Sequence, residues 1–471
     1  MKLFTYSPGG IYPDEEKLTR EKAFERLRSP SVVVIPLSQH TGAPNTPLVK
    51  VGDHVLVGTL IGSSSQFVSA PVHSSVSGDV IAIEERIVPS GNKVQSVVIK
   101  NDFKDEWVEL KAVGNLDSVS KEELIKVIRD SGIVGLGGAA FPTAVKLSPP
   151  MGKVINTVIA NGAECELYLT TDHRVMLEFT DDVINGLLIE MKATGAKEGI
   201  IAVENNKIDA ANALEQRVKD RNITNVEVVL VKTKYPQGGE KQLVKAILGK
   251  EIPSGGLPLD VGVVVQNVGT LKAVADAVLS GRPLIERGIT VSGTAVQKPG
   301  NYIVRIGTQV KDIIDELGLN RKLRKLIFGG PMTGVAQSTV DAPVVKGTSG
   351  ILMFGEEAFD MSPDEESPCI RCASCVDNCP MGLLPTLIDY ASRRQDLKLA
   401  EELHALDCIE CGVCSYVCPA NRHLTENIKK AKQGIIKQKK IEAAKQAAFE
   451  KLKALKEKER LEKQAREEVQ K

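Results

Sequence analysis

The pattern of apolar and polar residues changes along the chain and divides it into predicted domains. Residues 30–117 contain short alternating runs, including HVLVGTLIG and GDVIAIEERIV, separated by Gly, Ser, Asn and Pro, and this alternation predicts β-strands. Residues 118–285 alternate helical patterns, such as KEELIKVIRDSG, with apolar runs such as NVEVVLV and DVGVVVQNV. This order predicts an α/β layer fold, in which ligands bind where loops leave the strand ends.

The remainder of the chain predicts a small β domain and then helices. Residues 286–355 contain the predicted hairpin ITVSGTAVQKPGNYIVRIGT, followed by a helical pattern, VKDIIDELGL. Residues 356–425 include a stretch rich in Leu, Ala and charge that predicts two short helices. Residues 426–471 pair Lys with Glu at helical spacings and predict a charged helical tail. With a lead segment at residues 1–29, the chain is predicted to be a multidomain α+β protein.

An apolar stripe runs along the predicted C-terminal helix. Its members are Ile441, Ala444, Ala448, Leu452 and Leu455. Such a stripe is compatible with a partner helix and equally with a single solvated helix, and the sequence leaves both interpretations open.

Charge and composition exclude several classes of function. Sixty basic side chains balance sixty acidic ones, so no overall field draws the chain to nucleic acid. No run approaches the roughly eighteen apolar residues that a membrane span requires. The N-terminal sequence MKLFTYSPGG lacks the apolar region of a signal peptide, which predicts a cytoplasmic protein.

Eight of the nine cysteines lie in two short runs of identical spacing. CIRCASCVDNCP begins at Cys369, and CIECGVCSYVCP begins at Cys408; both read C-x2-C-x2-C-x3-C-P. This is the bacterial ferredoxin pattern, in which three cysteines hold one iron–sulfur cluster and the fourth ligates the other. The pattern therefore predicts two [4Fe-4S] clusters that lie close together.

The crossover rule assigns a set of four cysteines to each cluster. Cluster 1 takes Cys369, Cys372, Cys375 and Cys418, and cluster 2 takes Cys408, Cys411, Cys414 and Cys379. Zinc ribbons also use short C-x2-C pairs, but a C-x2-C-x2-C-x3-C run that is used twice and ends in proline fits zinc poorly.

A glycine-rich segment, SGIVGLGGAAFPTAVK, gives G-x-G-x-x-A from Gly135. A predicted helix precedes it where a dinucleotide fingerprint requires a strand. Successive backbone N–H groups in such a loop can converge on a phosphate without obstruction from side chains. On its own, the segment is compatible with a simple turn.

The order of motifs resembles a known family. GLGGAAFPTAVK, VIANGAECE, YPQGGEKQLVKAILG and VVVQNVGTL follow one another as in the flavin subunit of respiratory complex I. The stretch from VKVGDHVLVGTLIG to VSAPVHSSVSGDV resembles a biotinyl/lipoyl barrel-sandwich domain, although SSSQF offers no lysine for a swinging arm. The predicted hairpin domain is similar to a β-grasp (SLBB-like) module, for which a bracing role is the simpler interpretation.

These modules, in this order, resemble the RnfC family, whose members are subunits of the Rnf complex, the ion-translocating ferredoxin:NAD oxidoreductase. GGIYPDEEKLT near the N-terminus and GGPMTG at Gly329 are also similar to that family. The resemblance runs from residue 4 to about residue 430. It implies a barrel-sandwich domain, an α/β FMN/NAD-binding domain, a β-grasp domain and an all-helical two-cluster ferredoxin domain.

The resemblance also implies a set of cofactor-binding residues. Those that correspond to flavin contacts are Gly135, Gly137, Gly138, Lys146, Asn161, Glu164, Tyr235, Gly238, Glu240 and Asn267. KLSPP follows Lys146 and lacks the aromatic residue that stacks on nicotinamide in the complex I relative, so Phe141 is expected to substitute and Glu166 to bind ribose hydroxyls. Ala163 replaces an acidic residue, and Cys165 is interpreted as a small packing residue.

The predicted flavin-binding residues and the two cysteine runs together imply electron transfer. Hydride carriers move two electrons and iron–sulfur clusters move one, so a flavin is needed between them. We expect non-covalent FMN, NAD(H) as substrate, and no acid–base catalytic residue. The expected partners are a ferredoxin-like iron–sulfur subunit and integral membrane subunits, with the chain peripheral on the cytoplasmic face of the cell inner membrane. A soluble flavin/iron–sulfur reductase, such as a cobalamin reductase, and a non-catalytic iron–sulfur wire or scaffold without flavin are the alternatives.

Overall fold

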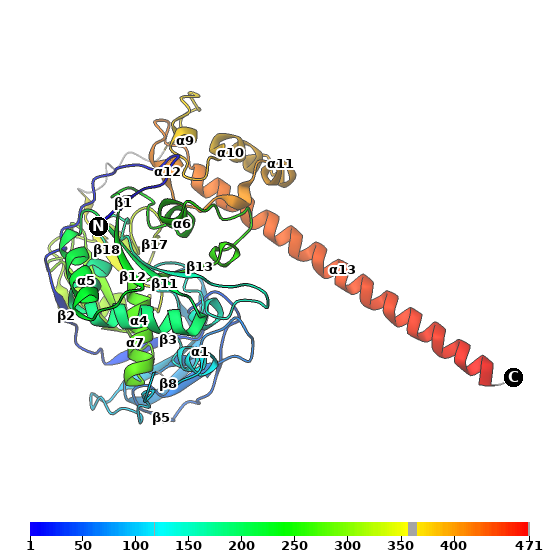
Figure 1. The fold of residues 1–471 in the computed structure, drawn as a ribbon, viewed down its shortest axis with the longest axis horizontal. Helices are drawn as coiled ribbons and strands as arrows, with labels where there is room; N and C mark the ends of the chain where they lie inside the picture. The colour runs from blue at the N-terminus through cyan, green and yellow to red at the C-terminus, as the bar shows by residue number, and fades with distance from the viewer. Residues whose placement is uncertain (117, 357–364, 470–471) are drawn as a thin grey trace. The chain divides into compact units, whose positions relative to one another are not determined.

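The computed structural model describes residues 1–116, 118–356 and 365–469 and divides the chain into two compact units, Met1–Pro363 and Asp364–Lys471 (Figure 1). Residue 117, which ends the predicted barrel-sandwich domain, residues 357–364 in the predicted ferredoxin domain, and residues 470–471 of the tail lie outside the described residues. The two units are described separately below.

A parallel five-stranded sheet forms the centre of the α/β layer, with strand order β1-β12-β11-β10-β13. Its strands are β1 (Leu3–Phe4), β10 (Thr157–Gly162), β11 (Glu198–Glu204), β12 (Val226–Val231) and β13 (Val263–Asn267). Alternate residues point to opposite faces, so Val158 joins one hydrophobic cluster and Ile159 the other. Burial on both faces explains the almost continuous apolar runs in the sequence.

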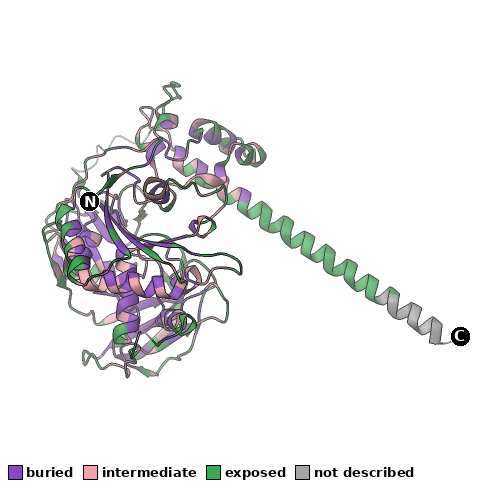
Figure 2. Cartoon of the chain, viewed as in Figure 1, coloured by how far each residue is buried: buried purple, intermediate pink, exposed green. Residues whose placement is uncertain are grey.

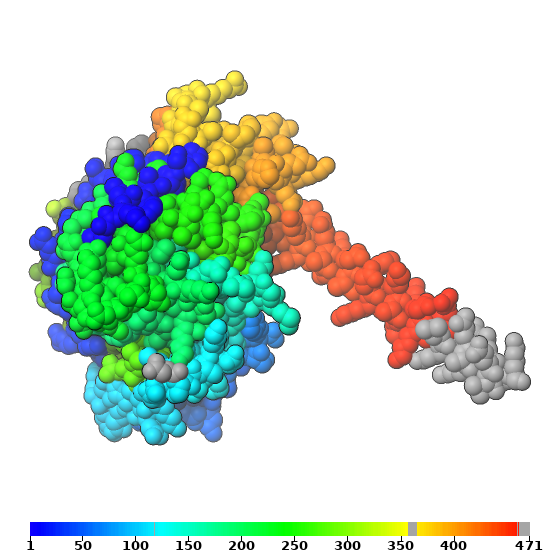
Figure 3. Space-filling view, viewed as in Figure 1, coloured from blue at the N-terminus to red at the C-terminus, as the bar shows by residue number. Residues whose placement is uncertain are grey.

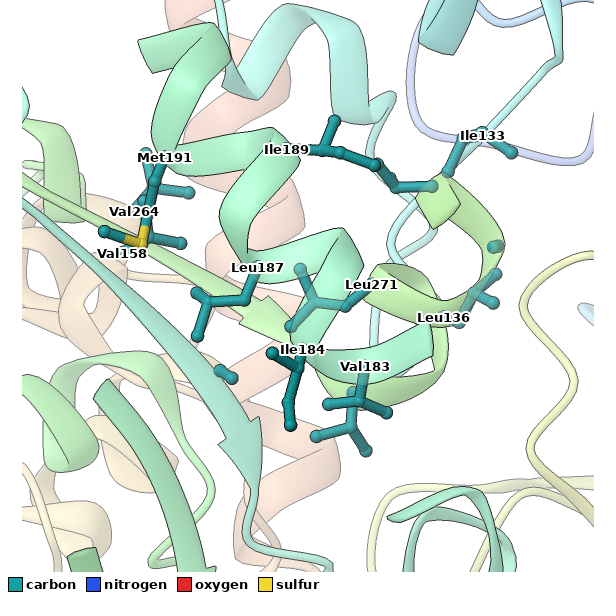
Figure 4. Close-up of a cluster of buried hydrophobic side chains, with 14 of the residues drawn as sticks. Ile133, Leu136, Val158, Val183, Ile184, Leu187, Ile189, Met191, Val264 and Leu271 are labelled. Atoms are coloured by element: carbon teal, nitrogen blue, oxygen red, sulfur yellow. The ribbon is translucent and has the colours of Figure 1, made fainter. Parts of the chain in front are cut away.

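Helices cover both faces of this sheet. One face packs against a large cluster with side chains from α1 (Lys121–Asp130), α4 (Thr180–Thr194), α5 (Ile208–Asp220) and α7 (Val268–Ser280), and the other packs against α6 (Glu240–Leu248). Figure 4 shows Ile184, Leu187 and Leu271 in the first cluster. Helices α4 and α7 approach so closely that a Cβ at Gly186 would lie 2.0 Å from the Leu271 carbonyl oxygen, so only glycine fits there.

Two small sheets form the predicted barrel-sandwich domain. One has the order β3-β9-β8-β5 and the other β4-β6-β7. Their strands are β3 (Val32–Pro36), β4 (Thr46–Pro47), β5 (His54–Val55), β6 (Leu60–Ser63), β7 (Val72–His73), β8 (Gly78–Ile87) and β9 (Lys93–Asn101). Val33, Ile61, Val72 and Ile99 belong to one buried cluster, which therefore joins the two sheets.

The β-grasp region is a six-stranded mixed sheet with the order β17-β16-β18-β14-β15-β2. Its strands are β2 (Phe24–Arg26), β14 (Glu286–Ser292), β15 (Gly300–Arg305), β16 (Lys325–Phe328), β17 (Val335–Gln337) and β18 (Gly350–Phe354). Strands β14 and β15 are antiparallel, as the hairpin pattern predicts, and helix α8 (Val310–Leu317) contributes Val310, Ile313 and Leu317 to the adjoining core.

The lead segment is part of both sheets. Its strand β1 pairs with β12 in the parallel sheet, and its strand β2 pairs with β15 in the β-grasp sheet. The sequence pattern of residues 1–29 gave no strand prediction, because each strand has only two or three residues.

The second unit is helical. Around the cysteines it contains α9 (Ser374–Asp377), α10 (Pro385–Arg393), α11 (Leu397–Glu402), α12 (Val413–Tyr416) and the start of α13 (Leu424–Val469). The two helices predicted between the cysteine runs correspond to α10 and α11.

Helix α13 begins inside the core of this unit. Leu424, Ile428, Ala431 and Ile435 are buried there, so no structural boundary falls at the predicted tail start, residue 426. Farther along, the helix is exposed and continues alone as a rod (Figures 2 and 3). The predicted apolar stripe lies on this exposed part, where Leu455 is 55% exposed.

Candidate functional site

Two asparagines stand at the carboxyl ends of neighbouring strands, β10 and β13. Asn161 and Asn267 are direct partners in the parallel register. The Asn161 side chain donates to the Gly238 carbonyl oxygen at 2.9 Å and accepts from the Ala163 N–H at 3.1 Å. Asn267 caps helix α7, accepting from the N–H groups of Gly269 at 2.9 Å and of Thr270 at 3.3 Å. Both side chains therefore fix loops at the strand ends.

The glycine-rich loop lies between α1 and α2 (Thr143–Lys146) and rests on this edge. Its ends are joined by a hydrogen bond from the Gly135 N–H to the Phe141 carbonyl oxygen at 2.8 Å. A Cβ at Gly137 would lie 2.8 Å from the Asn267 side-chain nitrogen. A Cβ at Gly138 would meet no atom within 4 Å. The loop is thus packed at Gly137 and open at Gly138, where a ligand can approach the backbone.

Lys146 and Glu240, which the sequence suggests separately, form an ion pair. The lysine ends helix α2 and the glutamate begins helix α6. The ammonium also donates to the Val265 carbonyl oxygen at 2.6 Å, which ties it to the middle of β13. One positive and one negative side chain are therefore held beside β13.

The loop that contains Tyr235 and Gly238 packs against the segment after β10. Tyr235 is buried, precedes a cis peptide bond to Pro236 and exchanges backbone hydrogen bonds of 2.9 Å with Ile11. A Cβ at Gly238 would lie 2.4 Å from the Ala163 carbonyl oxygen. Gly238 therefore permits a backbone approach that other residues would block.

Two glutamates predicted to contact ligands bind other parts of the chain. Glu164 is buried and accepts from the Asp172 N–H at 2.8 Å and from the His173 N–H at 3.3 Å, at the start of helix α3 (Thr171–Glu178). Glu166 accepts from the Met332 N–H at 2.7 Å and from the Thr333 hydroxyl at 3.0 Å. These contacts join Glu166 to the GGPMTG turn, residues 329–334, and burial raises the pKa of the Glu166 carboxyl. The expected ribose contact of Glu166 stays a prediction.

Cys165 and Phe141 complete the predicted set. The Cys165 thiol is buried and accepts from the Gly238 N–H at 3.4 Å, and burial raises its pKa to about 12, which keeps it protonated. This agrees with a packing role. Phe141 is 36% exposed at the end of the glycine loop.

Lys17 supports the loop after β10, a role that the sequence analysis did not predict. Its ammonium donates to the carbonyl oxygens of Glu164 at 2.8 Å, Glu166 at 2.7 Å and Leu169 at 2.6 Å. Burial lowers the Lys17 pKa. Lys17 belongs to GGIYPDEEKLT, so the signal was present as a family motif but without a role.

Asp172 and Arg287 form a second buried support. The Asp172 carboxylate accepts from the Asn267 side-chain amide at 2.7 Å, and burial, followed by the Glu164 charge, raises its pKa to about 7. Arg287, on β14, donates to the Leu136 carbonyl oxygen at 3.2 Å and to that of Thr348 at 2.9 Å, and burial lowers its pKa to about 10. The β-grasp sheet thereby holds the glycine loop in place.

The cysteines of the second unit gather as the crossover rule predicts for cluster 2. Cys379, from the first run, lines one small cavity of about 20 Å³ with Cys408, Cys411 and Cys414 from the second run. Burial raises the pKa of Cys411 to about 12 and of Cys414 to about 11.

In the other predicted set, Cys375 of the first run lies near Cys418 of the second run. Burial, with smaller contributions from the nearby Cys418 and Cys369, raises the pKa of Cys375. Cys369 and Cys372 are exposed. In the described part of the chain, no three His, Cys, Asp or Glu side chains converge on a point suited to a single ion.

Four family models match consecutive parts of the chain. The RnfC barrel sandwich hybrid domain matches residues 5–104, and the Nuo51 FMN-binding domain matches residues 128–276. The SLBB domain matches residues 289–336, and the 4Fe-4S dicluster domain matches residues 368–422. The fold thus combines barrel-sandwich, FMN-binding, SLBB and iron–sulfur domains, as the sequence predicts.

Curated relatives match nearly the whole chain. The RnfC subunit of the Na(+)-translocating ferredoxin:NAD(+) oxidoreductase complex of Acetobacterium woodii is 46% identical over 92% of this chain and 97% of its own length. The RnfC subunit of the proton-translocating ferredoxin:NAD(+) oxidoreductase complex of Clostridium ljungdahlii is 45% identical over 89% of this chain and 92% of its own length. This chain belongs to the RnfC family.

One solved structure similar to this RnfC family member is the NAD+-reducing [NiFe]-hydrogenase in the H2-reduced state. The match covers 71% of this chain and 67% of that chain, with a TM-score of 0.46 and 18% identity. Among the described residues, no helix combines the length and the apolar character required to span a membrane.

Proposed function

We propose that this chain is the electron-transfer subunit of an ion-translocating ferredoxin:NAD+ oxidoreductase complex, passing electrons between a ferredoxin-like partner and NAD(H). Its place in the RnfC family, over about nine-tenths of the chain, is the observation that carries this proposal. Two crossed sets of cysteines and a glycine loop beside parallel strand ends supply the chemistry that such a role requires.

In this proposal, non-covalent FMN lies against the open backbone at Gly138. When bound, the flavin accepts electrons in pairs and releases them singly. Lys146 supplies a positive charge at the site, while Asn161, Asn267 and Gly238 keep the surrounding loops in place. Glu164 and Glu166 shape the site through their contacts to helix α3 and the GGPMTG turn. Phe141 is the proposed wall of the nicotinamide site.

The second unit is proposed to hold two [4Fe-4S] clusters. Cys369, Cys372, Cys375 and Cys418 bind one, and Cys379, Cys408, Cys411 and Cys414 bind the other. Each set takes its fourth cysteine from the other run, so the two clusters lie close together, which favours electron transfer between them.

The proposed partners are the other subunits of the complex, including a ferredoxin-like iron–sulfur subunit and integral membrane subunits. The relatives are named as subunits of such complexes. We place the chain as a peripheral subunit on the cytoplasmic face of the cell inner membrane.

Anaerobic purification followed by analysis of iron, sulfide and flavin tests this function. We expect FMN, two clusters per chain, and bleaching of both chromophores when NADH is added. A protein that holds iron but no flavin would support the wire or scaffold alternative. A complete, NADH-reducible protein that cannot exchange electrons with reduced ferredoxin in the assembled membrane complex would favour the soluble reductase.

A further inference from the structure

A cavity of about 330 Å³ lies in the first unit, next to the supports of the glycine loop. Its walls come from strand β2, helices α3 and α7, strands β14 and β15, and the segment around Trp107. None of the residues proposed to contact flavin or nicotinamide lines it. Its volume falls at the lower end of the range for small-molecule sites.

The carboxylates around this cavity are paired. Asp105 accepts from Arg305 at 2.8 Å, and Asp276 accepts from Lys272 at 2.6 Å. Glu286 accepts from Arg26 at 2.6 Å. At the inner end, Asp172 accepts from the neighbouring asparagine amide, and its raised pKa weakens its negative charge.

Two arginine side chains at the cavity, Arg305 and Arg282, can still bind an anion. Arg305 is only 8% exposed, and its Nη1 has no hydrogen-bond partner among the described residues. Arg282 forms no ion pair within the described part of the chain. Both guanidinium groups contact the Trp107 ring, with the central carbons 5.7 Å and 5.8 Å from its centroid. The indole thus contacts both cations, and both arginines line the cavity.

The walls beyond these arginines include apolar surface. Val175, Phe179, Ala273 and Ile303 line the cavity, as does Leu136 of the glycine loop. A purely inorganic ion would leave this surface without a contact, whereas an apolar group would bury it.

We propose that this cavity binds a small organic anion, with a carboxylate or phosphate head at Arg282 and Arg305 and an apolar body about the size of one ring against Val175 and Ala273. The exposed Arg282 supplies accessible N–H donors for the head, and the Arg305 charge adds to the attraction. Hydrogen bonds between guanidinium and carboxylate or phosphate are among the strongest in proteins.

Calorimetric titration of the full-length, cofactor-loaded protein tests this site. The probes are benzoate, phenyl phosphate and inorganic phosphate, which separate the two head groups and the contribution of the ring. We expect at least one ring-bearing probe to bind more tightly than inorganic phosphate. Failure of both ring-bearing probes to bind would overturn the proposal.

Two variants locate the binding. Arg282→Ala alters an exposed side chain and is expected to weaken binding about tenfold or more. Arg394→Ala is the matched control, because Arg394 is also exposed and lies 5.2 Å from an aromatic ring, that of Tyr390, in the second unit. Equal binding by wild type and Arg282→Ala would contradict the proposed head site.

Ala273→Leu tests the apolar end of the cavity. The larger side chain is expected to weaken the ring-bearing probe and to leave any binding of inorganic phosphate unchanged. Unchanged affinity for the ring-bearing probe would refute the placement of the apolar body. These outcomes concern binding alone, so they stand apart from the proposed redox function.

Discussion

The substitution Gly138→Ala isolates contact with the flavin from the stability of the protein. The added methyl group would meet no protein atom within 4 Å, and Gly138 does not have a left-handed backbone conformation. In flavin-free protein the change should be neutral or raise the unfolding free energy by about 0.4–1 kcal/mol, because alanine restricts the unfolded chain. If FMN lies against this backbone, the methyl group occupies its space. Overpacking of this kind costs about 1–3 kcal/mol, which corresponds to a Kd about 5- to 150-fold weaker.

Substitutions at two other glycines serve as controls for this measurement. Gly114 is exposed and open in the same way, so Gly114→Ala should likewise be neutral or slightly stabilising, and it should leave FMN affinity unchanged. Gly137→Ala places its Cβ 2.8 Å from the Asn267 side chain and should lower the thermal midpoint even without flavin. FMN is titrated into each flavin-free variant by fluorescence quenching, and thermal midpoints are recorded in parallel. If Gly138→Ala binds FMN as tightly as Gly114→Ala, flavin does not lie where we propose.

Three further outcomes follow from the structure. The double variant Cys379→Ser/Cys411→Ser alters only cluster 2 and should retain one cluster, whereas Cys379→Ser/Cys372→Ser alters both clusters and should retain none. Iron content and electron paramagnetic resonance measure this, and the reverse pattern would disprove the crossover. Gly238→Ala should lower the unfolding free energy by about 1–3 kcal/mol in denaturant titration, because its Cβ would lie 2.4 Å from a carbonyl oxygen; unchanged stability would contradict the close approach. The Asp172 carboxyl has a pKa of about 7 in the folded protein and about 3.8 in the unfolded chain, so its contribution to the free energy of unfolding falls as pH rises between these values. Asp172→Asn should flatten that pH dependence in thermal melts. An unaltered pH profile would argue against the shift.

The iron–sulfur set was the most predictable part of the site. Its cysteines repeat at fixed short spacings, and the chemistry of thiolates with iron restricts what such spacing can hold. The structure brings Cys379 to the three cysteines of the second run, 29 or more residues away, because α10 and α11 fold the intervening chain back. Here the spacing of the cysteines in the sequence was enough to predict most of the arrangement.

The roles of Glu164 and Glu166 could not be predicted from local sequence. Family resemblance assigned both carboxylates to the loop after β10, but their partners depend on the packed fold. Glu166 bonds to residues 166 and 167 positions later, and Lys17 reaches Glu164 across 147 positions. Sequence periodicity reports which face of an element is buried, and it has no access to contacts over such separations. The strands in the lead segment were missed because they are too short to show alternation.

The bracing interpretation of the β-grasp sheet gains a physical basis from these distant contacts. Arg287 ties β14 to the Leu136 carbonyl oxygen in the glycine loop, and the GGPMTG turn binds Glu166 through Met332 and Thr333. Loops that hold a cofactor need their conformation fixed before the cofactor arrives, since ordering them later would reduce affinity. The β-grasp sheet can therefore influence the geometry of the proposed flavin site through these loops. Arg287, Lys17 and the two glutamates each satisfy backbone groups that an apolar side chain in the same place would leave unpaired.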